Sequence, residues 1–255
     1  MLTYVLVPER DLPPDAGFIG FGQAHLIMLA VLLAASAGIV VLGCRMDGKH
    51  RRRLLKCLAT EMLLLELGTD IILIYKDAFS VGYLPLHLCN IAMFLCLWFA
   101  WWPSSDLAGQ LIWSLCFPAG IAALLFPDWT NMPILQFQSL SSFVYHAVMV
   151  QFSLVSVISG MAKPRLQSVW KTMVFLMAMA AVVYWINLKL KTNFMFLNWP
   201  LPGTPLMLCA ALPGRWGYLL GYTVLVAGVL VLLNLPFSLG KRRLNLRAKH
   251  REAGS

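Results

Sequence analysis

The chain has 255 residues, of which 60% are hydrophobic and only 12% are charged, and its mean hydropathy is +0.75. Soluble domains are about 45–50% apolar and about 25% charged, so the composition excludes an ordinary soluble fold and indicates a polytopic membrane protein. The net charge of +9 accompanies no Gly-rich phosphate loop, no zinc-finger spacing and no interleaved basic and aromatic patch. We therefore expect neither a nucleic-acid partner nor a bound cofactor.

Seven apolar runs follow an N-terminal extracytoplasmic segment, residues 1–20, which contains the helix-breaking pair Pro13-Pro14. Each run approaches the roughly 20 residues that a helix needs to cross the hydrocarbon of a bilayer. The sequence therefore predicts an all-α bundle of seven transmembrane helices, a single membrane domain over 21–239, and a basic tail over 240–255. The predicted spans are 21–43, 55–75, 82–102, 107–126, 138–161, 167–188 and 216–239.

The distribution of Lys and Arg predicts the orientation of this bundle, because cytoplasmic segments are enriched in both. With the N-terminus outside, 15 of these residues fall in cytoplasmic segments and 5 fall on the opposite side. We therefore expect a multi-pass protein of the cell (inner) membrane with a cytoplasmic C-terminus. The basic runs themselves are explained by attraction to the anionic cytoplasmic leaflet.

The connection over 189–215, between the sixth and seventh predicted spans, is neither apolar nor strongly charged. It contains several prolines and glycines, which dictate turns, and aromatic residues that suit the headgroup level of the outer face. A connection of this length with so much turn chemistry is more typical of an ordered lid than of a flexible linker.

Polar side chains from several spans fall at a similar depth beneath the predicted outer face. Ionisable groups are costly inside a membrane and usually face a bundle interior or a water-filled site. A rise of about 1.5 Å per residue gives the depth of each group below the outer end of its span. The depths are roughly 6 Å for His25, 8 Å for Asp70, 10 Å for Cys89, 12 Å for His146 and 13 Å for Glu66, and Asn187 closes the sixth span at the same end.

Cys89 and His146 are the candidates for nucleophilic chemistry at this depth. A thiol is a weak nucleophile until a base or a positive neighbour generates the thiolate. His87 is a poor base for Cys89, because residues two apart on a helix point to opposite sides, and we expect His87 to pair with Asn90 or with an acid of the second span. The alternatives are a Cys89 thiol that packs as a small hydrophobe and a His146 that is hydrogen-bonded and structural.

Four parts of the chain resemble the YwaF-like integral membrane family. They are Phe18 to His25, Leu84-Pro85-Leu86-His87-Leu88-Cys89, His146 after Ser141-Ser142, and Asn193 to Leu197 with Gly203-Thr204-Pro205-Leu206. This family is distantly similar to a eukaryotic membrane acyltransferase that makes ether phospholipids through a cysteine and a histidine, although Asn90 stands where that enzyme has a second histidine. The resemblance implies acyl transfer between membrane phospholipids, or hydrolysis, with Cys89 as the thioester nucleophile and His146 as general base and acid.

The other polar residues then have substrate-binding or orienting roles: His25, Glu66, Asp70, His87, Asn90, Asn187 and Asn193. A second hypothesis is a non-enzymatic, proton-coupled transporter that uses four of them (His25, Glu66, Asp70 and His87) as a relay. A third hypothesis is metal or haem binding through His25, His87 and His146. The absence of tight ligand spacing disfavours it, so we assign no metal ligands.

Overall fold

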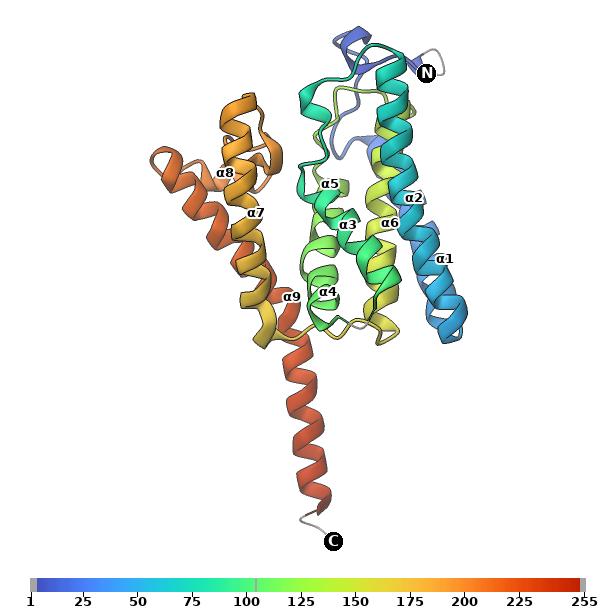
Figure 1. The fold of residues 1–255 in the computed structure, drawn as a ribbon, viewed down its shortest axis with the longest axis vertical. Helices are drawn as coiled ribbons and strands as arrows, with labels where there is room; N and C mark the ends of the chain where they lie inside the picture. Colours follow the sequence, from blue (N-terminus) through green and yellow to red (C-terminus); the bar gives the residue numbers. More distant parts are fainter. Residues whose placement is uncertain (1–3, 104, 253–255) are drawn as a thin grey trace.

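The computed structural model describes residues 4–103 and 105–252, with side chains as far as Ser238. This part of the chain contains no strand and is organised around long helices (Figure 1). A π-helical turn, Ile112–Cys116, joins α4 to α5. The helices are α1 (Gln23–Arg45), α2 (Gly48–Tyr75), α3 (Leu88–Trp101), α4 (Asp106–Leu111), α5 (Phe117–Leu125), α6 (Phe137–Ile158), α7 (Val169–Leu190), α8 (Leu206–Cys209) and α9 (Gly214–Glu252).

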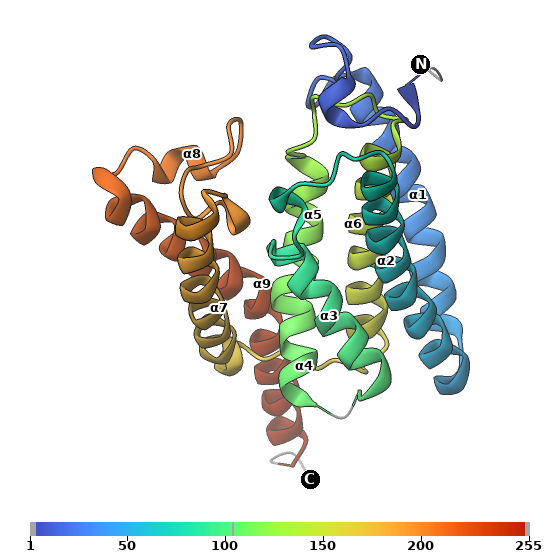
Figure 2. The same ribbon diagram turned by 45° about the horizontal axis from the view of Figure 1, so that its top comes forward.

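Helix α6 is the centre of the bundle and packs against α1, α2 and α5. Of its most apolar stretch, 67% is buried, against 6% for the peripheral α1. Helices α7 to α9 stand beside the α1–α6 bundle, and the gap between the two groups widens toward the end where the N-terminus lies (Figure 2). The core is therefore built on α6, and the group of α7 to α9 is an appended layer.

In the described part of the chain, six helical segments are long and apolar enough to cross a membrane: Gln23–Arg45, Val81–Trp101, Asp106–Leu125, Phe137–Ile158, Leu166–Leu190 and Gly214–Ser238. Their outward faces expose large apolar side chains such as Trp170, Val174 and Met177 on α7. The chain is thus a multi-pass membrane protein. Helix α2 packs along α6 but carries Glu61, Glu66 and Asp70 and is not among the six, so a seventh span stays a prediction.

The tight turn between α1 and α2 is fixed by two charged side chains. Asp47 caps the N-terminus of α2, where its carboxylate accepts hydrogen bonds from the backbone N–H groups of Lys49 and His50 at 2.8 and 3.0 Å. The Arg51 guanidinium donates to three carbonyls around the C-terminus of α1: those of Gly43, Cys44 and Met46. The groups left unpaired at both helix ends are thereby satisfied.

The third predicted span, 82–102, is helical only from Leu88 onward. Residues Val81–Tyr83 form a 3₁₀ turn, and His87 is the extended N-cap residue of α3. Pro85 explains this break, because it has no N–H and disfavours helical geometry in the residue before it. The expectation that His87 and Cys89 point to opposite sides of one helix is therefore wrong, since His87 precedes the helix.

The connection between α7 and α9 is ordered, as its turn residues predict. Helix α7 ends at Lys191 with a left-handed backbone (φ 56°), and a 3₁₀ turn, Phe194–Phe196, and the short α8 follow. Asn187 holds the start of this connection: its side chain donates to the Phe194 carbonyl and accepts from the Phe194 N–H, both at 2.9 Å. Its role as a lid stays a prediction. Helix α9 continues past the predicted boundary at 240 to Glu252.

Candidate functional site

The N-terminal turn of α3 joins three of the predicted site residues by hydrogen bonds. The Cys89 thiol donates to Oδ1 of Asn90 at 3.8 Å, and Nδ2 of Asn90 donates to Oε1 of Glu66 on α2 at 2.5 Å. Asn90 is buried, whereas Cys89 and Glu66 each retain some accessible surface. The amide of Asn90 therefore connects the thiol of α3 to an acid of the neighbouring helix.

His146 lies in the middle of α6 with its two ring nitrogens in different situations. Nδ1 lies 2.7 Å from the Ser142 carbonyl oxygen, and because a carbonyl only accepts, Nδ1 must carry the proton. The neutral ring therefore has its lone pair on Nε2, for which the described chain offers no hydrogen-bond partner. The ring stacks on Trp129 with centroids 5.4 Å apart and is only 6% exposed. This tautomer leaves Nε2 available as a base.

A side chain of helix α6 hydrogen-bonds to the backbone of Cys89. The Tyr145 hydroxyl donates to the Cys89 carbonyl at 3.0 Å, and its ring meets the His146 ring edge-on at 5.2 Å. Within the described residues, no hydrogen bond joins Cys89 to His146, since the thiol is turned toward Asn90. The two groups thus share one region of the bundle, but their contact passes through Tyr145.

His87 contacts the connection that follows α7. Its Nδ1 accepts a hydrogen bond from the Met195 N–H at 3.4 Å, and its ring packs against Phe194 and Phe196 with centroids 5.3 and 5.5 Å away. The expected pairing of His87 with Asn90 or an acid of the second span is therefore wrong. The cause is the extended backbone at His87, which directs its ring away from α2.

Asp128, in the loop between α5 and α6, was not expected from the sequence to belong to this region. Its charge interacts electrostatically with His87 and with Cys89 and so contributes to the field of this region. The protein atoms packed around Asp128 raise its pKa, although the residue keeps accessible surface, and the nearby His87 acts in the opposite direction. No periodic pattern marks a loop residue of this kind, so only tertiary structure locates it.

The two acids in the C-terminal half of α2, Glu66 and Asp70, form no salt bridge with any described side chain. The salt bridges of the described chain are Arg10–Asp11 and Asp47–His50, and both lie outside this region. Asp70 is half-buried one helical turn from Glu66, and its charge acts on Glu66. An acid at this depth without a counter-ion is typical of a functional position rather than of a structural ion pair.

Three of the predicted site residues serve the fold. His25 is fully buried, and its ring accepts from the Phe21 N–H at Nδ1 and donates to the Leu124 carbonyl at Nε2, both at 2.9 Å. Asn187 and Asn193 bind the backbone of the connection after α7, Asn193 by donating to the Trp199 carbonyl. All three positions are therefore occupied by backbone partners.

Among the described residues, no group of three or more His, Cys, Asp or Glu side chains is arranged to hold a metal ion. Hydrogen bonds join Glu66 of α2 to Asn90 and Cys89 of α3, and Tyr145 links this group to His146 on α6. The candidate cluster consists of these residues with the neighbouring His87 and with Asp128, whose charge acts on the group: Glu66, His87, Cys89, Asn90, Asp128 and His146. This arrangement can support proton transfer and thiol chemistry without a metal.

Long apolar helices that surround a polar cluster define an integral membrane protein with a candidate site within its bundle. The chain belongs to the TMEM164 family, whose model matches residues 20–234, a stretch that contains every residue of the cluster. No curated protein and no solved structure matches the chain. The resemblance to the YwaF-like family and to the cysteine/histidine acyltransferase stays a prediction.

Proposed function

We propose that the protein is a lipid acyltransferase, or an acyl hydrolase, of the cell membrane, in which Cys89 is the nucleophile and His146 the general base and acid. The proposal includes α2 as a seventh span, with the N-terminus outside and the C-terminus in the cytoplasm. Membrane phospholipids are the acyl donor and acceptor. In this orientation the polar cluster lies in the outer half of the bilayer.

The tautomer of His146 is the observation that carries this proposal. Because the Ser142 carbonyl fixes the proton on Nδ1, Nε2 is free to accept a proton from a thiol or a hydroxyl. Tyr145, which precedes His146 in the chain, donates a hydrogen bond to the backbone carbonyl of Cys89. This hydrogen bond links the helix that carries the base to the residue that carries the thiol.

The reaction would proceed in two balanced steps. In the first, Nε2 of His146 takes the thiol proton, the Cys89 sulfur attacks the ester carbonyl of a phospholipid, and the C–O bond breaks. The protonated His146 returns its proton to the departing lysolipid oxygen, and the acyl group remains as a thioester. In the second, Nε2 deprotonates the hydroxyl of a lysolipid or a water, whose oxygen attacks the thioester carbonyl. The C–S bond breaks, and the protonated His146 returns its proton to the departing Cys89 sulfur.

The proposal requires a rotation of the Cys89 side chain. The thiol now donates to Asn90, so it must turn toward His146 when substrate is bound, in keeping with catalytic hydrogen bonds that form only in the substrate complex. Asn90, Glu66 and Asp70 would then orient the thiol and the lipid headgroup, and His87 would connect the site to the turn that contains Met195.

The test is intact-protein mass spectrometry of the purified protein after incubation with a phospholipid of defined chain length. We expect one added acyl mass, its removal by hydroxylamine, and its assignment to Cys89 by peptide mapping. Cys89→Ala should abolish the adduct. Cys57→Ala is the matched control, because Cys57 is an exposed thiol that would collect any non-enzymatic acylation. An adduct that follows Cys57 instead, or acceptor turnover without any adduct, would contradict the covalent mechanism.

A proton-coupled transporter is the second candidate, favoured by the position of Glu66. This intramembrane acid has no cationic partner and hydrogen-bonds to the buried Asn90, as a proton-carrying site would require. Transport needs no thiol, so a functional Cys89→Ser variant together with an inactive Glu66→Gln variant in a vesicle uptake assay would favour this alternative.

A further inference from the structure

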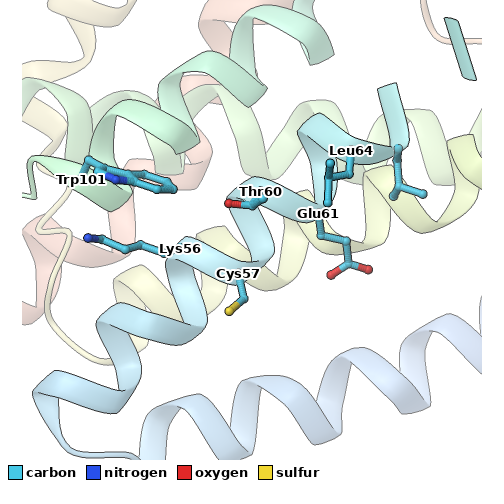
Figure 3. Close-up of a pocket in the computed structure, with 7 residues that line it drawn as sticks. Lys56, Cys57, Thr60, Glu61, Leu64 and Trp101 are labelled. Atoms are coloured by element: carbon cyan, nitrogen blue, oxygen red, sulfur yellow. The ribbon is translucent and has the colours of Figure 1, made fainter. Parts of the chain in front are cut away.

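A groove with a volume of about 500 Å³ opens along the first half of α2, away from the Cys89 region. Figure 3 shows Lys56, Thr60 and Trp101 together at one end and Leu64 farther along the helix. The residues that line it include Lys56, Thr60, Glu61, Leu64, Leu65 and Trp101. Lys56 precedes Glu66 by ten residues, about 15 Å along the helix. The basic end of the groove is therefore distant from the candidate site, whereas its apolar end at Leu65 adjoins Glu66.

The end of the groove near Lys56 is cationic. The Lys56 ammonium lies 5.0 Å from the centre of the Trp101 ring, a cation–π distance. No carboxylate in the described chain forms a salt bridge with Lys56. Arg52 and Arg53, one turn earlier on α2, are exposed and add to the positive potential. This end of the groove therefore favours the binding of a negatively charged group.

The polarity of the lining falls along the helix. Glu61 lies five residues, or about 7.5 Å, beyond Lys56, and Leu64 and Leu65 lie a further turn along the helix. With α2 as the seventh span, as proposed above and on which this inference rests, that direction leads toward the bilayer centre. The Thr60 hydroxyl makes no hydrogen bond in the described chain, and Glu61 is exposed on the groove surface. A carboxyl group that faces hydrocarbon is held in its neutral form, because charge is costly there. Neutral Glu61 can donate its O–H.

We propose that this groove binds one anionic phospholipid of the leaflet at the basic end of the bundle. The phosphate accepts hydrogen bonds from Lys56 and Thr60, and the O–H of Glu61 donates to an acyl ester carbonyl. One acyl chain lies against Leu64 and Leu65. The order of groups along α2 (ammonium, hydroxyl, carboxyl, alkyl) matches the order of phosphate, glycerol ester and chain in a phospholipid.

The charge around Lys56 selects an anionic headgroup over a zwitterionic one. The cation of a choline headgroup would extend toward Arg52 and Arg53, where it is repelled, whereas a glycerol headgroup carries no such cation. Each Lys or Arg near an anionic membrane surface contributes about 1 kcal/mol, which corresponds to about fivefold in affinity. The preference should therefore depend on Lys56.

The experiment is native mass spectrometry of the purified full chain in detergent, titrated with phosphatidylglycerol or with phosphatidylcholine. We expect one phosphatidylglycerol to bind more tightly than phosphatidylcholine. Lys56→Gln should weaken phosphatidylglycerol binding by about fivefold. Leu64→Trp, which fills the apolar half of the groove, should weaken both lipids. The midpoint of thermal unfolding shows that each variant is folded, and Thr60→Val replaces Lys56→Gln if that variant does not fold.

Lys171→Gln is the matched control. Lys171 lies 5.8 Å from the Trp170 ring at the start of α7, so this variant removes the same charge from a similar pair that does not line the groove. Equal losses from Lys171→Gln and Lys56→Gln would show only a diffuse attraction and would overturn the site. Equal affinity of the wild type for both lipids would also overturn it. The proposal does not depend on Cys89, so an inactive thiol leaves it intact.

Discussion

The side-chain amide of Asn90 donates a hydrogen bond to the carboxylate of Glu66, across the interface between α3 and α2. The other end of the same amide accepts from the Cys89 thiol, so the orientation of the amide depends on both neighbours. An amide cannot transfer a proton along this path without changing its own structure, but it can hold both groups in place. The pair is therefore a positioning device next to the candidate nucleophile.

Replacement of Asn90 by Ala should destabilise the protein by about 1–3 kcal/mol, because it leaves the Glu66 carboxylate without its donor in a half-buried place. The double variant Asn90→Ala/Glu66→Ala should lose less stability than the sum of the two single losses, since the unpaired charge is then absent. The free energy of unfolding, measured by denaturant titration in detergent, checks the cycle. Additive losses would contradict an interaction between the two side chains.

Much of the helical architecture could be predicted because apolar run length sets where a helix can cross a bilayer. The predicted span 138–161 corresponds to α6 (Phe137–Ile158), and 21–43 to α1 (Gln23–Arg45). Local backbone breaks do not change hydropathy, so the π-helical turn within the fourth span was invisible. Pro85 is a local signal for a break, and α3 begins three residues after it, at Leu88.

For the candidate site, the sequence predicts a common depth of the polar residues but not their partners. Helical rise placed Glu66, Cys89 and His146 at similar levels, and the structure joins the first two through Asn90. The contact between His87 and Met195 spans 108 positions of sequence and depends on the left-handed backbone at Met195 (φ 57°), which no local pattern of this chain indicates. Asp128 lies in a loop, where no periodic pattern of the sequence indicates which residues are its neighbours.

His146→Asn should keep the fold and lose the chemistry. The side-chain nitrogen of asparagine can occupy the place of Nδ1 and donate to the Ser142 carbonyl, but nothing replaces the lone pair of Nε2. Intact-protein mass spectrometry should find no acyl adduct, and circular dichroism should find native helix content. A normal adduct in this variant would exclude His146 as the base.

His25→Asn should lower the stability of the protein and leave its acylation chemistry unchanged. It removes the hydrogen bond from Nε2 to the Leu124 carbonyl and leaves a buried carbonyl unpaired, at a cost of about 1–3 kcal/mol. Because both His25 nitrogens bind backbone groups away from Cys89, the adduct per folded molecule should be unchanged. Thermal unfolding and adduct yield, measured on the same sample, separate the two effects.

Gly120→Ala should disturb the position of His146. A Cβ at Gly120 would lie 2.8 Å from the Val150 side chain and 3.0 Å from the His146 carbonyl oxygen, so α5 and α6 must separate, at a cost of about 1–3 kcal/mol. Gly68→Ala on α2 is the control, because a Cβ there meets nothing within 4 Å, and the change should be neutral or stabilising by up to ~1 kcal/mol. Equal unfolding free energies for the two variants would contradict a close contact at Gly120.

Asn234→Leu should loosen α9 from the main bundle. The buried Asn234 side chain accepts from Gln110 at 3.0 Å and donates to the Ser114 hydroxyl at 3.1 Å. Its loss removes two buried hydrogen bonds, while Gln110 and Ser114 stay bonded to each other. We expect a destabilisation of about 1–3 kcal/mol and faster hydrogen exchange in α9 than in α6. Uniform acceleration across both helices would show that α9 does not open separately.

Asp47 should make the start of α2 sensitive to acid. The backbone N–H of His50, and then its side chain, lower the pKa of the exposed Asp47 from 3.8 to about 2. A lowered folded-state pKa means that the stabilisation is complete above pH 3.8 and is lost as the pH falls through about 2. Hydrogen exchange of the first turn of α2, corrected for intrinsic rates, should therefore be slower in wild type than in Asp47→Ala at pH 6 and should converge as the pH approaches 2. Asp47→Asn keeps an oxygen acceptor that does not titrate, so its protection should not follow this change, and an equal acid response in that variant would assign the sensitivity to another group.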